Sequence, residues 1–239
     1  MRYRNLHDWA VSPRDAIALQ RQLSKQVALA PLAGPVRTVA GADLAINEPQ
    51  GTGIAGVVVY RVDHARGPTV RLEEIERAWA AGPLNFPYIP GLLSFREAPL
   101  LLRAFERLRA DVDLILCDGQ GIAHPRGLGI ASHLGLLLDR PAIGCAKSCL
   151  IGRSTPPSMA AGSHSPLTHG GRVIGAVVRS RAKVRPLFVS PGHRITLKEA
   201  VSWALACCDG YRIPKPTREA DQYVAALKKG RGAPAPGPR

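Results

Sequence analysis

The order of strand-like segments is the feature that most restricts the fold of this chain. Three apolar runs, 38–46, 53–62 and about 70–79, follow one another with only short turn segments such as 47–52 between them. Runs of this kind joined by short turns are typical of a meander of antiparallel strands. The first half of the chain therefore predicts three consecutive strands in one sheet.

From about residue 92 the pattern changes to an alternation of helices and strands. A helix is predicted over 92–109, a buried strand over 114–117, a second helix over 129–138 and a strand over 142–146. This alternation indicates parallel strands joined by helical crossovers. Three antiparallel strands followed by parallel ones, flanked by helices, form a mixed α/β sheet similar to the ribonuclease H-like arrangement. A similarity of fold sets no function by itself.

The remaining segments complete one domain, which we expect to span 1–229. Residues 153–171 are rich in Ser, Pro, Gly and Thr and are expected to form a loop, and the tail 230–239 is expected to be disordered. Ser12 is a suitable cap for a first helix. The other predicted elements are helices over 12–29, 196–207 and 217–229 and strands over 173–178 and 186–190.

Two aspartates stand at unusual places in the predicted strands. Asp43 interrupts the apolar run 39–46, and Asp118 ends the apolar run 114–117. A carboxylate in such a place is costly unless it is exposed, paired or bound to a metal. If the two strands are neighbours, their oxygens converge as Mg²⁺ requires. The alternative is that Asp43 lies at a strand edge and Asp118 is a turn residue before Gly119.

Two further acidic residues lie near predicted helix starts. Glu97 is early in the helix over 92–109, and Asp221 follows Thr217, a natural cap for the last helix. Both could simply complement the positive end of a helix dipole. From the residues alone, neither would be assigned a catalytic role.

The charge balance indicates a polyanionic partner. The 239 residues include 32 Lys and Arg against 18 Asp and Glu, a net charge of +14. Such a field attracts nucleic acid, with an anionic membrane surface as the rival partner. No apolar run is long enough to span a membrane, and no signal peptide is recognisable. The five cysteines fit no common zinc or disulfide spacing, so we expect free thiols in the cytoplasm.

Several stretches strongly resemble the endonuclease V family. Residues 87–97 read Pro-Tyr-Ile-Pro-Gly-Leu-Leu-Ser-Phe-Arg-Glu, and residues 118–126 read Asp-Gly-Gln-Gly-Ile-Ala-His-Pro-Arg. These runs are long and specific, and the matching stretches occur in family order over most of 1–229. The other matching stretches are 39–43, 129–133, 144–148, 189–193 and 212–218.

The resemblance implies a DNA repair nuclease that recognises deaminated bases, chiefly hypoxanthine (deoxyinosine). It implies hydrolysis of the second phosphodiester on the 3′ side of the lesion, with Mg²⁺ as cofactor and Mn²⁺ able to substitute. Asp43 and Asp118 match the metal ligands of the family. Glu97 matches a ligand that acts directly or through water.

The resemblance also implies catalytic roles for three other residues. Asp221 stands where the family carries a group near the attacking water. His124 and Lys147 match groups that contact phosphate or support the ligands, and Lys147 could neutralise charge on the scissile phosphate. Without the resemblance, His124 would be taken for a loop histidine and Lys147 for an exposed strand-end lysine.

The segment around Tyr88 resembles the family's strand-separating wedge. A damaged base must leave the stack before a pocket can read it, and a rigid aromatic can fill the gap. The alternative is a hydrophobic plug under a loop. Backbone groups of the glycine-rich segments are implied to line the base pocket. The residues expected to bind substrate are Tyr88, Pro90, Gly91, Leu93, Gly119, Gly121 and Ile130.

Two alternatives to DNA repair remain open at this point. One is the same chemistry on inosine-containing RNA, and the other is a basic nucleic-acid-binding protein without catalysis. The presence of Asp43, Glu97, Asp118 and Asp221 favours catalysis. We expect a monomer, because no heptad pattern indicates a partner subunit. The expected substrate is damaged DNA, single- or double-stranded.

Overall fold

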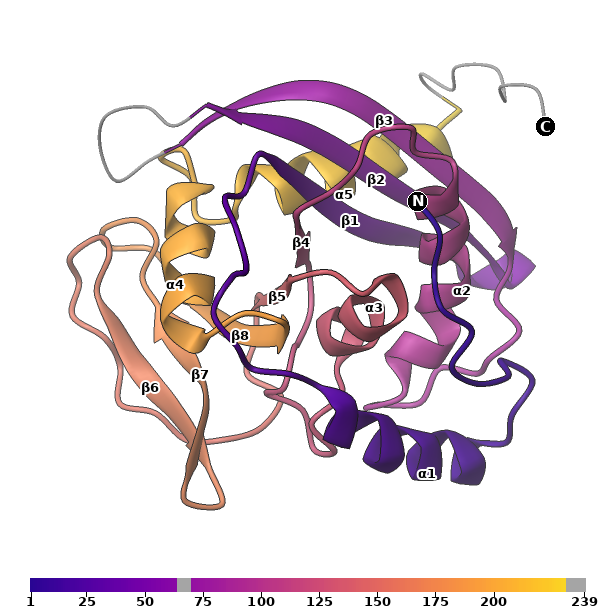
Figure 1. The fold of residues 1–239 in the computed structure, drawn as a ribbon, viewed down its shortest axis with the longest axis horizontal. Coiled ribbons are helices and arrows are strands. Elements are labelled where there is room, and N and C mark those ends of the chain that lie inside the picture. Colours follow the sequence, from indigo (N-terminus) through magenta and orange to yellow (C-terminus); the bar gives the residue numbers. More distant parts are fainter. Residues whose placement is uncertain (64–69, 231–239) are drawn as a thin grey trace.

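Eight strands form one mixed sheet in the computed structural model, which describes residues 1–63 and 70–230. Their order across the sheet is β3-β2-β1-β4-β5-β8-β7-β6 (Figure 1). The tail predicted to be disordered, 230–239, lies outside the described residues except for Gly230. The strands are β1 (Thr38–Asn47), β2 (Thr52–Asp63), β3 (Arg71–Pro83), β4 (Leu114–Cys117), β5 (Ala142–Ala146), β6 (His164–His169), β7 (Arg172–Val178) and β8 (Leu187–His193).

The pairing confirms the predicted fold class. β1, β2 and β3 form an antiparallel meander, and β4 is parallel to both β1 and β5. Beyond β5, strands β8, β7 and β6 add an antiparallel edge. The prediction of a loop over 153–171 was wrong at β6, because its polar and proline-containing sequence hides a strand in which only Ser165 and Leu167 point inward.

Helices cover both faces of the sheet. The cluster of buried residues on one face joins α2 and α3 to β1–β4, and the cluster on the other joins α4 and α5 to the same sheet. Figure 1 shows α5 running along β1 and β2. The helices are α1 (Pro13–Leu23), α2 (Leu93–Glu106), α3 (Ile130–Leu138), α4 (Leu197–Ala206) and α5 (Lys215–Lys228).

Two predicted helix boundaries need correction. Ser12 caps α1 as expected, but α1 ends at Leu23, and only a short 3-10 turn continues to Gln26. Thr217 does not cap α5, because the helix already begins at Lys215 and the Thr217 hydroxyl donates to the Pro214 carbonyl within the first turn. A proline at the start of a helix is favourable because its missing N–H has no partner there anyway.

Gly41 allows α5 to pack directly on β1. A Cβ at this position would collide with the carbonyl of Pro216 in the first turn of α5. The close approach brings the first turns of α5 next to the strand that carries Asp43.

No helix in residues 1–63 and 70–230 is both long and apolar enough to cross a membrane. Of the five free cysteines, only Cys149 is exposed.

A buried aromatic cluster ties the N-terminal segment to α2 and α3. His133 is 0% exposed, and its Nε2 lies 2.8 Å from His7 Nε2. Trp9 and Phe95 pack within 5.4 Å of the His133 ring centroid. Burial, together with the neighbouring His7, lowers the pKa of His133 to about 3, so its ring is neutral in the folded protein.

This burial predicts a loss of stability in mild acid. In the unfolded chain His133 has its ordinary pKa of 6.5. Below that pH the unfolded chain therefore binds a proton at His133 that the folded chain does not bind. Between pH 7 and pH 5 we expect His133→Phe to remove about 2 kcal/mol of the pH dependence of unfolding. Urea titrations at the two pH values measure this. His164→Phe, at an exposed histidine, is the control, and an unchanged pH dependence in His133→Phe would contradict the assignment.

Candidate active site

The carboxylates of Asp43 and Asp118 are brought together by the register of β1 and β4. The last paired residues are Ala42 and Cys117, so each aspartate follows directly in adjacent parallel strands. Neighbouring strands lie roughly 4.8 Å apart, and residues in register project to the same side. Both side chains are half-buried. The sequence predicted that the two carboxylates converge if their strands are neighbours. The strands are neighbours, so this condition is met.

Glu97 and Asp221 reach this cluster from opposite faces of the sheet. Glu97 lies in the second turn of α2, and Asp221 lies in the second turn of α5. Both are close enough to Asp43 for their negative charges to interact. The structure thus brings all four predicted carboxylates to one end of the sheet.

The cluster gathers more acidic groups than its surroundings can keep fully ionised. Burial raises the pKa of Asp43 to about 7, and the charges of Asp118 and Asp221 add to the shift. Burial also raises the pKa of Glu97 to about 8, again with help from Asp43 and Asp118. Like charges held in a poorly solvated place disfavour ionisation in this way. A bound cation would relieve both effects.

Lys147 is the cation next to the cluster. Its Nζ lies 2.5 Å from Asp118 Oδ2 and 4.0 Å from Asp221 Oδ2. Burial acts against its charge, but the hydrogen bond to Asp118 and the negative charges of Asp118, Asp221 and Asp43 together outweigh burial and raise the Lys147 pKa. Lys147 directly follows β5, which is parallel to β4, so its place is set by the same strand ends.

The donor chemistry of this cluster fits a hard divalent cation. All four acidic groups offer oxygen, which is the ligand that Mg²⁺ prefers. Within residues 1–63 and 70–230, no three His, Cys, Asp or Glu side chains form a ready ligand set. Asp118 is engaged by Lys147 instead. A metal ion would therefore compete with Lys147 for Asp118, while Asp43 and Glu97 supply uncompensated oxygens.

An apolar pocket opens beside these carboxylates. Its volume is about 200 Å³, and Glu97 and Asp118 form part of its wall. Six of the seven residues predicted to bind substrate line it; these are Tyr88, Pro90, Gly91, Leu93, Gly119 and Ile130. Gly119 has a φ of +155°, and a Cβ there would collide with Ile130. The glycine therefore keeps the pocket open.

Gly121 is the predicted binding residue that the structure does not place in the pocket. Its N–H donates to the Ser190 hydroxyl, and a Cβ would collide with the Pro191 carbonyl in β8. Gly121 is thus a packing residue beneath the pocket. The sequence analysis also missed some lining residues, three of them inside the matched stretches and three outside them; these are Ser94, Gln120 and Gly129, and Gln20, Leu128 and Leu150.

Comparisons with known proteins show which family this chain belongs to. The family model described as Endonuclease V matches residues 21–222. Endonuclease V of Dehalococcoides mccartyi strain BAV1 is 49% identical over 227 residues, covering 95% of this chain and 99% of the relative. The chain belongs to the endonuclease V family.

Solved endonuclease V structures share the fold. The Streptomyces avermitilis enzyme superposes with a TM-score of 0.84 at 39% identity, covering 93% of this chain and 96% of that one. The Ciona intestinalis enzyme, solved with a 24mer DNA containing an inosine followed by a ribo-adenosine, gives a TM-score of 0.76 at 23% identity, covering 91% and 98%. The family comparison identifies the protein as a nuclease.

The hydrogen bonds of the His124 ring are to Gly91 and Arg126. The Arg126 N–H donates to His124 Nδ1, so Nε2 carries the proton and donates to the Gly91 carbonyl at 3.0 Å. Burial, and then the charge of Arg126, lower the His124 pKa to about 4. The structure therefore places a neutral His124 in the pocket wall, and its predicted phosphate-contacting role remains a prediction.

Gln20 completes a network around the same carbonyl. Its side chain is 1% exposed, and its amide donates to the carbonyls of Gly91 and Leu128 at 3.0 and 3.2 Å. Arg126 donates to both Gln20 Oε1 and the Gly91 carbonyl. Gly91, with a φ of +79°, is thus fixed by donors from α1 and the loop after β4. The one available sequence signal was a polar Gln at helical spacing from Ala16 and Leu23.

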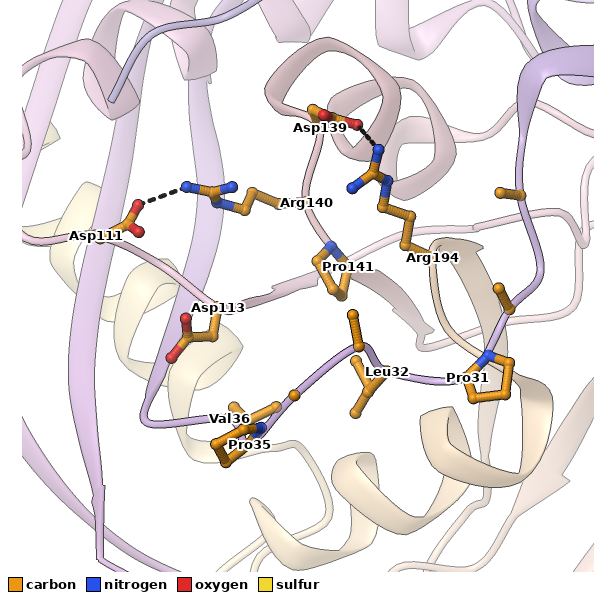
Figure 2. A pocket seen from close by; sticks show the side chains of 14 residues that line it. Pro31, Leu32, Pro35, Val36, Asp111, Asp113, Asp139, Arg140, Pro141 and Arg194 are labelled. Carbon is orange, nitrogen blue, oxygen red and sulfur yellow. Dashed lines mark hydrogen bonds and ion pairs between the residues drawn. The ribbon is translucent and has the colours of Figure 1, made fainter.

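A larger pocket, about 470 Å³ in volume, lies at the opposite end of the same strands. Asp113 and Pro141 line it where β4 and β5 begin, whereas Asp118 and Lys147 follow the ends of those strands. Figure 2 shows two ion pairs in this pocket, Asp139 with Arg194 and Asp111 with Arg140. Their N–O distances are 2.7 and 2.8 Å. This pocket is therefore remote from the carboxylate cluster.

The Gln20 network predicts that a change in α1 will disturb the pocket. Gln20→Leu leaves two buried carbonyls and Arg126 with fewer partners, which costs about 1–3 kcal/mol. We expect that loss of stability in urea unfolding, together with a raised KM for a substrate that occupies the pocket. Gln22→Leu, at an exposed position on the same helix, is the matched control. Equal effects of the two substitutions would argue against the network.

Proposed function

We propose that this member of the endonuclease V family hydrolyses a phosphodiester bond next to a deaminated purine, chiefly hypoxanthine, in DNA. The observation that carries the proposal is the shared wall between the apolar pocket and the carboxylate cluster, since Glu97 and Asp118 belong to both. A base held in the pocket would place a neighbouring phosphate of its own strand at the carboxylates. The second phosphodiester on the 3′ side is the bond that the family resemblance implies.

The pocket has the features needed to read a flipped base. Its walls are mostly apolar, and Gly91 and Gly119 expose backbone without side chains in the way. Such pockets use a few backbone groups for specificity. Hypoxanthine carries a carbonyl acceptor where adenine has an amino donor, so a backbone N–H would distinguish the two. The inosine-containing DNA bound by the Ciona intestinalis enzyme supports this substrate class.

Magnesium is the proposed cofactor, with Asp43, Asp118 and Glu97 as the residues that would hold it. When bound, such an ion neutralises charge on the phosphate and activates water at neutral pH. Asp221 is exposed at the edge of the cluster, where it can orient a water molecule. Lys147 stays protonated and can stabilise negative charge that develops on the scissile phosphate.

Tyr88 is proposed to fill the space that a flipped base leaves. Its ring is 61% exposed at the pocket, an unusual exposure for a large side chain. The flanking Pro87 and Pro90 limit the motion of the segment. Because base stacking on an aromatic ring is favourable, Tyr88 can replace the lost base–base contact.

The central test is cleavage of matched oligonucleotides carrying one inosine, in DNA and in RNA, with Mg²⁺ and with chelator. We expect Mg²⁺-dependent cleavage of the DNA on the 3′ side of inosine and none of the adenosine control. Asp118→Ala should reduce cleavage on the order of a hundredfold or more while binding persists. Asp111→Ala, at an exposed aspartate in the remote pocket, is the matched control. Cleavage of RNA alone would reject DNA as the substrate.

Tyr88→Ala tests the wedge separately from the chemistry. Loss of one stacking interaction should raise the KM for an inosine-containing duplex by about tenfold. Tyr88→Phe keeps the ring and should behave like the unmodified protein. Duplex cleavage that is the same for Tyr88→Ala and Tyr88→Phe would show that the ring does not separate the strands.

A further inference from the structure

Acidic residues are absent from one long part of this chain. From Arg140 to Lys198 the sequence contains ten Lys and Arg residues and no Asp or Glu, although the whole chain has 18 acidic residues. This part begins just before β5 and includes β6, β7 and β8, the antiparallel edge of the sheet. This part therefore contributes a net charge of +10, against +14 for the whole chain.

Three of these basic residues lie together between β7 and β8. Arg181, Lys183 and Arg185 are exposed, and none forms an ion pair within the part of the chain that the structure describes. We call residues 181–185 the basic segment. Its charges alternate with small or apolar residues, so they are available to an external anion.

Internal hydrogen bonds hold the basic segment in place. Arg179, which is buried, donates to the carbonyls of Ser158, Pro157 and Val184. The N–H of Lys183 donates to the Met159 carbonyl at 3.2 Å. Ordering that is already present in the free protein reduces the entropy lost on binding.

The basic segment continues directly from the catalytic end of the sheet. Arg212 donates to the carbonyl of Arg185 at 2.8 Å and to the carbonyl of Lys147 at 3.1 Å. Ala146 of β5 pairs with Phe188 of β8, so the chain before β8 lies next to Lys147. The base pocket is walled by α2, α3 and the loop after β4, whereas Arg212 precedes α5. A strand that leaves the pocket across the carboxylates would meet the basic segment.

An exposed aromatic residue adjoins this path. Tyr211 is 55% exposed, and the guanidinium of Arg218 lies 3.9 Å from its ring centroid. The neighbouring Arg212 makes the contacts to Lys147 and Arg185 described above. Positive side chains beside an exposed ring are the combination that single-stranded nucleic acid binds, through phosphates and base stacking.

We propose that the basic segment and Tyr211 form a track for the sugar–phosphate backbone of the substrate strand beyond the scissile bond. The track rests on the proposed function, because it assigns the same strand a path after the active site. It binds the backbone without reading sequence, since phosphate contacts carry no base information. It therefore extends affinity to nucleotides that the base pocket cannot reach.

The test compares binding of two single-stranded inosine oligonucleotides in chelator, one extended by several nucleotides on the 3′ side of the inosine and one truncated there. In the variant with Arg181→Gln, Lys183→Gln and Arg185→Gln, we expect about tenfold weaker binding of the extended strand and a smaller loss for the truncated one. The slope of log Kd against log salt concentration should fall by about two for the extended strand, because three phosphate contacts are lost at roughly 0.7 each. Tyr211→Ala should weaken binding of the extended strand, and Tyr211→Phe should not.

The control neutralises Arg71, Arg103 and Arg109, three exposed arginines on β3 or on and after α2, at the opposite edge of the sheet. The same loss in this control, or an unchanged salt dependence in the basic-segment variant, would overturn the track. Failure of the proposed function gives a different result, namely no cleavage of inosine DNA by the unmodified protein. Binding is measured without cleavage, so either proposal can fail alone.

Discussion

The parallel pairing of β1 with β4 is the constraint on which the active site depends. Because Ala42 and Cys117 are in register, the next residue of each strand is an aspartate, and two carboxylates must share one sheet end. Glu97 and Asp221 add further negative charge from α2 and α5. Burial and mutual repulsion raise the pKa values of Asp43 and Glu97. The fold thus concentrates negative charge that a single lysine does not balance.

The apolar pocket and the carboxylate cluster are linked because they use the same elements. Leu93 in the first turn of α2 lines the base pocket, and Glu97 in the next turn belongs to both the pocket and the carboxylate cluster. The turn at Gly91, just before α2, is fixed by Gln20, His124 and Arg126. A change that moves this turn therefore alters the pocket and the position of Glu97 together.

The charge of the chain is divided between two regions for which we propose different roles. The acidic cluster is small and half-buried, where it can hold a cation against a phosphate. The acid-free part, from Arg140 to Lys198, is exposed at the basic segment, which we propose attracts the backbone of the same strand. Lys147 and Arg212 lie where these two regions meet.

The sequence alone determined the order of the helices and of all strands except β6, because local periodicity and turn residues specify those elements. It also identified the four carboxylates, since motifs that are continuous along the chain carried the family resemblance. Only the tertiary structure could show that Gly121 packs under the pocket, that His124 faces Gly91, and that Gln20 reaches the same carbonyl from α1. It likewise revealed β6, whose polar sequence gives no strand signal by itself. These features depend on contacts between segments far apart in the chain, and local pattern does not encode such contacts.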